Sequence, residues 1–342
     1  MTASPVQTSH TRPRTIAYIV GSARSGSTLL GMLLGNHPEC FAMGEMDSLG
    51  SYLSRAKSPN ALCTCGRMLD ECPFWKAVLV RAQELLKETG IAQDLAMLRE
   101  RPLNRQYGTG LFDTNIHGFH PSWIHTAMHR AALLAATSLP HCASRLTLRR
   151  FGGRYRKAAE NSLFWYGIIS QVSERPVVLD CGKGVLRMLA LGACAPGPLK
   201  VIHLIRDGRG QAASMKRATR QDVATSARRW VRGNRRIMRM YGRMDASNVC
   251  RVSYEALCRD PRATLEVLYA FLGCRAFHEG EWQRALTLEK TSSHMLGGNP
   301  MRFRNDERTI APDERWRDEL SEDELRRFQN VKGAREMLEL CR

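Results

Sequence analysis

The chain lacks an apolar stretch long enough to cross a membrane. The best candidates for such a stretch, 131–139 and 185–191, are far shorter than the roughly 18 residues that a transmembrane helix needs. The amino terminus, MTASPVQTSHTRPRT, also lacks the apolar core of a secretory signal. We therefore expect a soluble protein of the cytoplasm.

Acidic residues are scarce relative to basic ones. The 342 residues include 51 lysines and arginines against 33 aspartates and glutamates, which gives a formal net charge of +18. A surplus of this size favours anionic partners such as phosphates, sulfates, nucleic acids or acidic surfaces. The charge alone does not choose among them.

Cysteine is too sparse for a fold held together by disulfides. The count of 11 is odd, and over 342 residues it fits reduced thiols better than a disulfide framework. With 43% hydrophobic and 25% charged residues, the chain is globular, so disorder, collagen and coiled coil are excluded as its main state.

The alternation of strands and helices along the chain predicts an α/β fold. A strand at 16–20 is followed by a glycine-containing loop and a helix at 26–35. Three more strands are predicted at 176–180, 199–205 and 248–253, with helices at 209–217, 227–243 and 261–272. Strands separated by helices pair in parallel, so we expect a three-layer sandwich with a central parallel sheet.

The remaining segments complete the predicted organisation. Residues 1–14, rich in Ser, Thr and Pro, are expected to form a flexible tail, and 15–342 a single domain. Within this domain, 75–175 is predicted to be a helical insertion with helices at 75–87, 123–139 and 154–172. We expect it to cover the carboxyl edge of the sheet, where ligands bind in such folds.

The glycine loop predicts a phosphate site. Residues from Gly21 to Thr28, GSARSGST, match the spacing G-x-x-x-x-G-K-[ST] except that Ser27 replaces the lysine. This spacing turns successive backbone N–H groups toward a phosphate at a helix amino terminus. The missing lysine counts against phosphoryl transfer from ATP, and Arg24 is the cation that the loop offers instead.

Two further segments place cations after predicted strands. Arg206 follows the strand at 199–205 and Ser214 lies on the next helix, so a guanidinium and a hydroxyl can hold a second phosphate. Lys183 follows the strand at 176–180. Because the carboxyl ends of parallel strands meet at one edge, these groups should converge with the glycine loop. Two anion sites at one edge imply a ligand with two phosphates.

Five segments, in this order, resemble the 3′-phosphoadenosine 5′-phosphosulfate (PAPS) dependent sulfotransferases: GSARSGSTLLGMLLGNHPECFAMGE, LDCGKGVLRML, VIHLIRDGRGQAASM, VSYEAL and HMLGGNPMRF. They are most similar to the bacterial group related to tyrosylprotein and carbohydrate sulfotransferases. The resemblance spans roughly 15–310. It implies a P-loop NTPase-like fold, PAPS as the donor substrate, and adenosine 3′,5′-bisphosphate as the product.

The resemblance also implies which residues hold the donor. The 5′-phosphosulfate would lie on the loop residues Arg24, Ser25, Gly26, Ser27, Thr28 and Leu29. Arg206 and Ser214 match the pair that grips the 3′-phosphate, and Tyr254 matches a tyrosine that contacts the nucleotide. In the late loop 294–303, which would close over the nucleotide, Arg302 is the candidate phosphate ligand.

The implied reaction is in-line transfer of a sulfuryl group to an acceptor hydroxyl or amine. Glu45 is the candidate general base, since it lies where the tyrosylprotein relatives carry their proposed catalytic glutamate, and His203 and His37 are rival candidates. Arg24 and Lys183 would stabilise charge on the leaving phosphate. The Lys183 segment lacks the family's proline, which leaves its loop geometry open. No metal is expected to take part.

Two clusters of potential metal ligands have other interpretations. Cys63, Cys65 and Cys72 could hold a metal or form one disulfide, but no fourth ligand is visible at zinc spacing, and thiols packing under Phe74 and Trp75 are favoured. The histidines in the second cluster, His117, His120, His125 and His129, lack the glutamate of a zinc-protease motif and are interpreted as acceptor-pocket or surface residues.

Two other functions stay open as alternatives. The first is a P-loop kinase-like phosphotransferase with a degenerate loop, for which Asp180 would be the Mg²⁺ ligand. The second is a basic nucleotide-binding protein without catalysis. The basic segment 200–243 is not accompanied by a nucleic-acid motif, so we do not expect nucleic acid as a partner. The sequence leaves open the acceptor, whether small molecule, glycan, lipid or peptide, and the oligomeric state.

Overall fold

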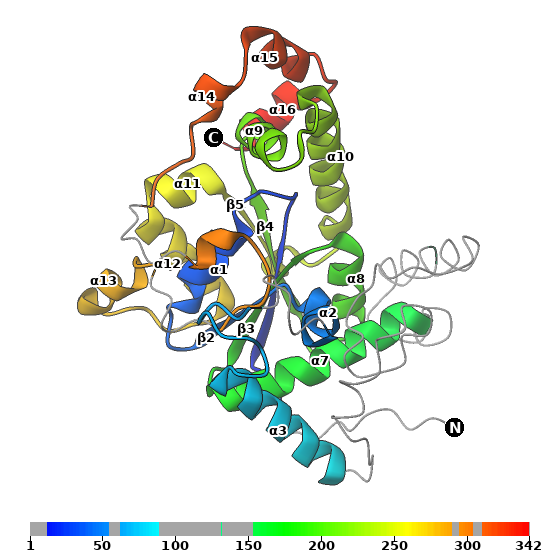
Figure 1. The fold of residues 1–342 in the computed structure, drawn as a ribbon, viewed down its shortest axis with the longest axis vertical. Helices are drawn as coiled ribbons and strands as arrows, with labels where there is room; N and C mark the ends of the chain where they lie inside the picture. The colour runs from blue at the N-terminus through cyan, green and yellow to red at the C-terminus, as the bar shows by residue number, and fades with distance from the viewer. Residues whose placement is uncertain are drawn as a thin grey trace.

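The centre of the protein is a sheet of five parallel strands in the order β2-β3-β1-β4-β5 (Figure 1). The computed structural model describes residues 12–54, 62–88, 131, 153–288, 294–303 and 310–341. The strands are β1 (Thr15–Val20), β2 (Cys40–Gly44), β3 (Val177–Lys183), β4 (Leu199–Ile205) and β5 (Val249–Ser253). This arrangement confirms the predicted α/β fold with a central parallel sheet.

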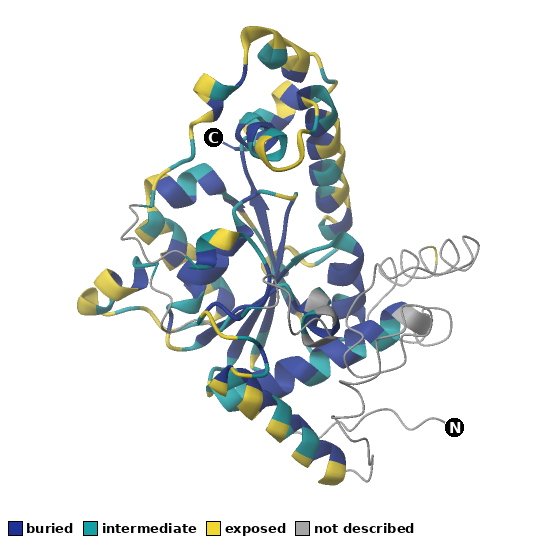
Figure 2. Cartoon of the chain, in the orientation of Figure 1, coloured by how far each residue is buried: buried dark blue, intermediate teal, exposed yellow. Residues whose placement is uncertain are grey.

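Helices cover both faces of the sheet, so the central strand β1 is buried from Ile16 to Val20. On β1, Ala17 and Ile19 face one core while Tyr18 and Val20 face the other, and all four side chains are fully buried. Figure 2 shows the strands as the buried centre between helical layers. The sequence AYIV therefore alternates between two cores rather than between core and solvent.

The helices divide between these two faces (Figure 1). One core contains residues of α1 (Ser27–Gly35), α11 (Tyr254–Arg259), α12 (Pro261–Leu272) and α13 (Trp282–Ala285). The opposite core contains residues of α3 (Pro73–Glu88), α7 (Gly153–Ser173), α8 (Val185–Cys194) and α10 (Val223–Tyr241). The expected helices within 75–175 are confirmed in α3 and α7, and the one expected at 123–139 lies outside the described residues apart from position 131.

A third apolar cluster lies beyond the carboxyl end of β4. It joins α9 (Gly208–Thr219) and α10 to α14 (Trp316–Glu319), α15 (Glu322–Gln329) and α16 (Ala334–Glu339). Trp230 and Phe328 are its largest fully buried side chains, with ring centroids 5.7 Å apart. The short elements that remain are α2 (Leu49–Ser54) and the 3₁₀ turns Met46–Ser48, Ala246–Asn248, Glu279–Glu281 and Pro300–Phe303.

The strand β2 was not predicted from the sequence. Its residues CFAMG include no β-branched side chain and end in glycine, so propensity gives no strand signal there. Pairing with β3 overrides that preference, with Phe41 opposite Val178. As a result Glu45 directly follows a strand at the carboxyl edge of the sheet.

Two details of the helices also concern the sequence predictions. The helix expected at 227–243 begins earlier, at Val223, because the Asp222 carboxylate accepts a hydrogen bond from the N–H of Thr225 and so forms the cap. Of the helices in the described part of the chain, none is both long and apolar enough to span a membrane.

Candidate functional site

The glycine loop after β1 is tightly turned and packed. Gly26 has φ 96°, and a Cβ atom there would lie 2.5 Å from the Tyr254 ring. A Cβ atom on Gly21 would lie 2.6 Å from the carbonyl oxygen of Leu204. Arg24 also adopts a left-handed conformation, with φ 67°. The glycines are therefore required by close contacts with β4 and α11.

The amino terminus of α1 offers unpaired donors. Its first internal hydrogen bond runs from the N–H of Leu30 to Gly26, so the N–H groups of Ser27, Thr28 and Leu29 have no acceptor within the helix. In the described part of the chain the buried Ser22 and Ser25 hydroxyls have no hydrogen-bond partner. Buried donors at the positive end of a helix suit an anion.

Arg206 is buried beside this loop. One guanidinium nitrogen donates to the carbonyl oxygen of Arg24 at 3.1 Å, and another lies 3.1 Å from Asp313. The guanidinium also stacks over the Tyr254 ring, 4.5 Å from its centroid. Tyr254 thus separates Gly26 from Arg206 and fixes the distance between loop and cation.

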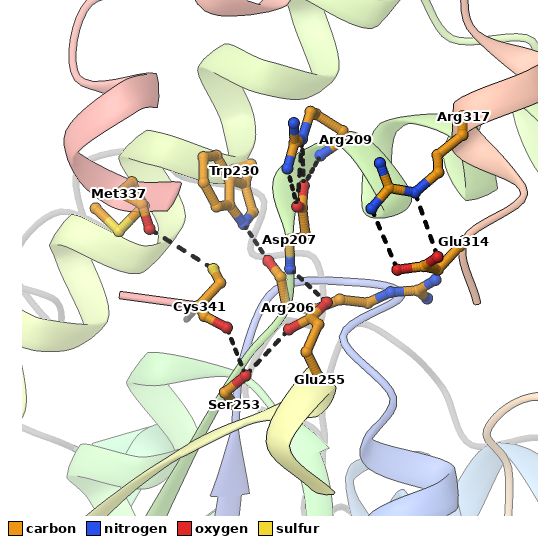
Figure 3. Close-up of polar contacts among 10 residues, drawn as sticks. All are labelled: Arg206, Asp207, Arg209, Trp230, Ser253, Glu255, Glu314, Arg317, Met337 and Cys341. Carbon is orange, nitrogen blue, oxygen red and sulfur yellow. Dashed lines mark hydrogen bonds and ion pairs between the residues drawn. The ribbon is translucent and has the colours of Figure 1, made fainter. Parts of the chain in front are cut away.

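The backbone around Arg206 is held by several elements (Figure 3). Trp230 on α10 donates its indole N–H to the Arg206 carbonyl at 3.1 Å, and Glu255 on α11 accepts the N–H of Asp207 at 3.0 Å. Ser253 in turn donates to Glu255 at 3.1 Å. These buried contacts make the strand-to-helix turn after β4 rigid.

Ser214 lies on α9 on the side that faces the glycine loop. Gln211, three residues earlier and thus on the same side of the helix, donates to the carbonyl oxygen of Ala23. Asp207 starts α9 by accepting the N–H of Arg209 at 2.8 Å. The structure therefore places Arg206 just before α9 and Ser214 in the middle of this helix, with Gln211 between them in contact with the loop.

Sequence reasoning missed Asp313. Its carboxylate contacts Arg315 at 2.7 Å, Arg206 at 3.1 Å and Arg217 at 3.4 Å. The hydrogen bond from Arg315 first, and then the charge of Arg206, hold the pKa of this carboxyl well below its usual range. The Asp313 carboxylate thus lies beside Arg206, at the position where the sequence predicts a phosphate of the ligand. No motif in the last thirty residues indicates this contact.

Glu45 and Lys183 form an ion pair. The Lys183 Nζ lies 2.5 Å from Glu45 Oε1, and the two side chains are 26% and 25% exposed. Lys183 ends β3 with φ 59°, and the N–H of Gly184 turns back to Gly182 at 2.7 Å. This left-handed turn is the loop geometry that the missing proline had left open. The predicted base and one predicted cation are therefore neighbours.

The late loop 294–303 joins these parts. The N–H of Leu296 donates to Met43 at 2.9 Å, and the N–H of Glu45 donates to Leu296 at 2.7 Å. Further along the loop, the N–H of Asn299 donates to the Thr28 hydroxyl at 3.0 Å. The loop therefore bridges the end of β2 and the start of α1.

Arg302 is buried inside this loop. Its guanidinium donates to the carbonyl oxygens of Gly297, Gly298 and Leu62, the last two at 3.2 Å. Burial lowers the pKa of this guanidinium. These contacts hold the loop against Leu62, and the role of Arg302 as a phosphate ligand stays a prediction.

The rival bases are hydrogen-bonded in the interior. His203 on β4 contacts Asn234 at 3.0 Å and Tyr241 at 3.3 Å, and burial lowers its pKa to about 4. His37 contacts the Arg275 carbonyl at 3.1 Å and accepts the N–H of Glu39 at 3.1 Å. Both ring nitrogens of each histidine are thus engaged, which leaves Glu45 as the candidate base.

Asp180 is fully buried, and the partly buried Asp47 lies within reach of its charge. Asp180 accepts hydrogen bonds from Tyr166, from Arg187 at 3.0 Å and from the N–H of Gly182 at 2.8 Å. Burial first, and then the charge of Asp180, raise the pKa of Asp47 to about 6. Asp47 could not be recognised from the sequence, because only the fold brings it near Asp180.

The comparison with protein families identifies the segment that carries Arg206. Residues 196–279 match the model of the sulfotransferase family, and this segment includes Arg206, Ser214 and Tyr254. The match confirms the resemblance to sulfotransferases and supports sulfotransfer as the general activity. No curated protein matches the chain.

Several solved structures are similar to the chain at low identity. The sulfotransferase domain from the Synechococcus PCC 7002 olefin synthase is 20% identical, with 94% of this chain and 96% of that chain covered and a TM-score of 0.47. Sulfotransferase STF1 from Mycobacterium tuberculosis H37Rv is 18% identical, with 80% and 71% covered and a TM-score of 0.43.

Proposed function

We propose that this chain, whose residues 196–279 match the sulfotransferase family, transfers a sulfuryl group from PAPS to a hydroxyl or amine of an acceptor. The observation that carries the proposal is the convergence of two anion positions at one edge of the sheet. One is the start of α1 with the unpartnered Ser22 and Ser25 hydroxyls, and the other is the Arg206 guanidinium. A donor with phosphates on both sides of its ribose fits such a pair.

The donor's two ends have separate binding groups. The 5′-phosphosulfate would lie on the N–H groups of loop residues 24–29, where the helix dipole favours negative charge. The 3′-phosphate would be held by Arg206 and the Ser214 hydroxyl, with Tyr254 packed under the guanidinium. To bind it, Arg206 must exchange the Asp313 carboxylate for the phosphate.

The reaction needs a base for the acceptor's proton and positive charge beside the leaving phosphate oxygen. A Glu45 oxygen takes the acceptor's proton as the new bond forms between sulfur and the acceptor oxygen or nitrogen, and the bond between sulfur and the bridging phosphate oxygen breaks. Lys183 and Arg24 stabilise the charge that develops on that oxygen.

The kinase alternative is weaker because its metal ligand is occupied by the protein. Asp180 accepts three hydrogen bonds from Tyr166, Arg187 and Gly182, which leaves the carboxylate committed to the core. The loop also carries Ser27 where the phosphate-binding lysine of such kinases stands.

Calorimetry with adenosine 3′,5′-bisphosphate tests the donor class. We expect binding that does not depend on Mg²⁺, that exceeds the binding of ATP and AMP, and that is lost in Arg206→Ala. Arg228→Ala, an exposed arginine on α10, is the matched control and should bind as the wild type does. A preference for ATP with Mg²⁺, or the absence of nucleotide binding, would overturn the proposal.

A further inference from the structure

Three cysteines and a histidine from distant parts of the chain meet beside the late loop. Cys63, Cys65 and Cys72 lie on the segment before and at the start of α3, and His294 opens the loop 294–303. The ligand atoms of all four residues lie within 4.8 Å of one another. His294 is the fourth ligand that no local spacing could show, since it follows Cys63 by 231 residues.

The distances within this group are those of a tetrahedral metal site. The Cys72 sulfur lies 3.7 Å from the sulfurs of both Cys63 and Cys65. The Nδ1 atom of His294 lies 3.3 Å from the Cys72 sulfur and 3.4 Å from the Cys63 sulfur. Bonds of about 2.3 Å to sulfur and about 2.0 Å to nitrogen require ligand separations of about 3.8 and 3.5 Å in a tetrahedron.

The same distances exclude a disulfide in this arrangement. A disulfide needs sulfur atoms about 2.05 Å apart, whereas Cys72 is equally far from both of its neighbours at 3.7 Å. All three cysteines are free thiols. Packing alone does not require three sulfurs and a ring nitrogen to share one centre.

The loop around the cysteines is a tight turn. The N–H of Cys63 donates to the carbonyl oxygen of Arg67 at 2.9 Å, and the N–H of Gly66 donates to the carbonyl oxygen of Cys63 at 2.8 Å. Gly66 provides the turn after the second cysteine, with φ 85° and open space on its Cα. The backbone itself therefore holds the segment that carries the first two sulfurs.

Aromatic side chains orient the histidine. The Phe74 ring stacks on the His294 ring at 5.0 Å with an angle of 11° between the planes. The Trp75 indole N–H donates to the His294 carbonyl at 3.0 Å. Phe74 and Trp75 therefore pack as the sequence suggested, but they hold a ligand in place as well as filling a core.

We infer that Cys63, Cys65, Cys72 and the Nδ1 atom of His294 bind one Zn²⁺ ion in a closed, structural site. Soft thiolates with one imidazole in a tetrahedron select zinc over magnesium or calcium. Four protein ligands leave no position for water or substrate, so the ion has no part in the chemistry. On binding, Zn²⁺ displaces the protons of whichever cysteines are thiols, and nothing is oxidised or reduced.

A second group of similar composition does not meet the same standard. His37, Cys40 and Cys274 also lie close together, but both ring nitrogens of His37 are hydrogen-bonded to the backbone. Only two thiols, 3.4 Å apart, are then available. This group serves as the internal control for the experiment.

The zinc site would fix the late loop against the proposed active site. Thr64, between two of the ligands, donates its hydroxyl to the Met295 carbonyl at 3.0 Å. The residues that follow reach Glu45 and Thr28. The expected effect of the metal on activity rests on the proposed function, whereas the metal site itself does not.

Metal analysis of the full chain tests the site without donor or acceptor. We expect about one zinc per chain in protein purified under reducing conditions, and its loss in Cys72→Ser and Cys63→Ser. Cys274→Ser, from the control group, should keep its zinc. A wild-type protein that holds no zinc and takes up none on titration after reduction would overturn the proposal, as would full zinc content in Cys72→Ser.

A cobalt titration keeps the test decisive if a serine variant fails to fold. Chelator-treated wild-type protein should take up Co²⁺ with the charge-transfer bands of thiolate ligands, and Zn²⁺ should displace it. His294→Cys, which supplies a fourth thiolate, should still bind and show stronger bands, while His294→Ala should bind more weakly. Bands that are absent in the wild type or unchanged in both variants would contradict the assignment.

Discussion

At the scale of single residues, the contacts separate the groups that can react from those that are committed to the fold. The sequence offered two histidines as candidate bases and one aspartate as a candidate Mg²⁺ ligand: His203, His37 and Asp180. In the structure all three side chains are engaged in hydrogen bonds in the interior. Glu45 instead is partly exposed and paired with Lys183. A ranking of candidate catalytic residues by burial alone would have placed these three interior residues above Glu45.

Replacing Glu45 by Gln tests its role as base. We expect turnover to fall by about a hundredfold to ten-thousandfold, because the amide cannot take the acceptor's proton. Affinity for adenosine 3′,5′-bisphosphate, measured by calorimetry, should change little. Glu336→Gln, which removes a surface carboxylate paired with Arg235, is the control, and unchanged turnover in Glu45→Gln would refute the role.

Replacing Asp313 by Asn should strengthen nucleotide binding. The change removes the carboxylate that competes for Arg206, and a half-buried ion pair of this kind contributes about 1 kcal/mol, so we expect about fivefold tighter binding of the bisphosphate. Calorimetry measures this directly. Glu314→Gln, on an ion pair that does not involve Arg206, should have no effect. Weaker binding would mean that Asp313 orients Arg206 rather than competing for it.

The raised pKa of Asp47 predicts a pH dependence of stability. Its folded pKa of about 6 exceeds the value of about 3.9 in an unfolded chain. Below about pH 4 both states are protonated, and between about pH 4 and 6 the unfolded state ionises first, so the free energy of unfolding falls as pH rises. Relative to wild type, Asp47→Asn should gain about 2 kcal/mol across this window. Urea denaturation at several pH values measures it, and parallel curves would contradict it.

At the scale of elements, the strands and helices with strong patterns were predictable and the connections between them were not. The run LKVIHLI gave β4 with its correct bounds, and Pro261 and Gly273 marked the two ends of α12. CFAMG gave no strand signal because its pairing with β3 is a tertiary effect. The approach of His294 to Cys63 likewise depends on the loop that crosses the end of β2.

Replacing Gly44 by Ala should disturb the junction of β2 and the late loop. Gly44 has φ 79°, and a Cβ atom there would lie 2.1 Å from the Leu296 carbonyl oxygen. We expect a loss of at least about 1–3 kcal/mol in the free energy of unfolding, measured by urea denaturation. Gly197→Ala, where a Cβ atom meets nothing within 4 Å, is the matched control. Equal stability of the two variants would show that the loop moves aside.

At the scale of the whole molecule, the charge of +18 fits a protein that collects anionic ligands. The sheet brings the ends of β1, β3 and β4 together, so that loop, lysine and arginine from three segments share one edge. The predicted convergence of these segments came from the rule that parallel strands end together. Their partners, such as Asp313 in the segment before α14, could not be predicted, because the last thirty residues carry no motif.

Charge reversal on the outer face of α10 tests the contribution of the overall field. Replacing the exposed Arg232, Arg236 and Arg239 together by Glu should slow association of the bisphosphate severalfold and leave dissociation unchanged, because steering acts on encounter rather than on the bound state. Stopped-flow mixing with a fluorescent analogue separates the two rates. An effect confined to dissociation would show that these arginines touch the site.

The bridge between Leu296 and Gly44 has a consequence for how the protein behaves in solution. β2 is an edge strand, and edge strands with unpaired N–H and C=O groups invite other chains to add a strand. Leu296 supplies the missing partner to Met43 and Glu45 at the end of this edge. The contact of Leu296 that positions Glu45 therefore also protects the sheet edge from pairing with other chains. Loss of the loop should cause precipitation as well as loss of activity.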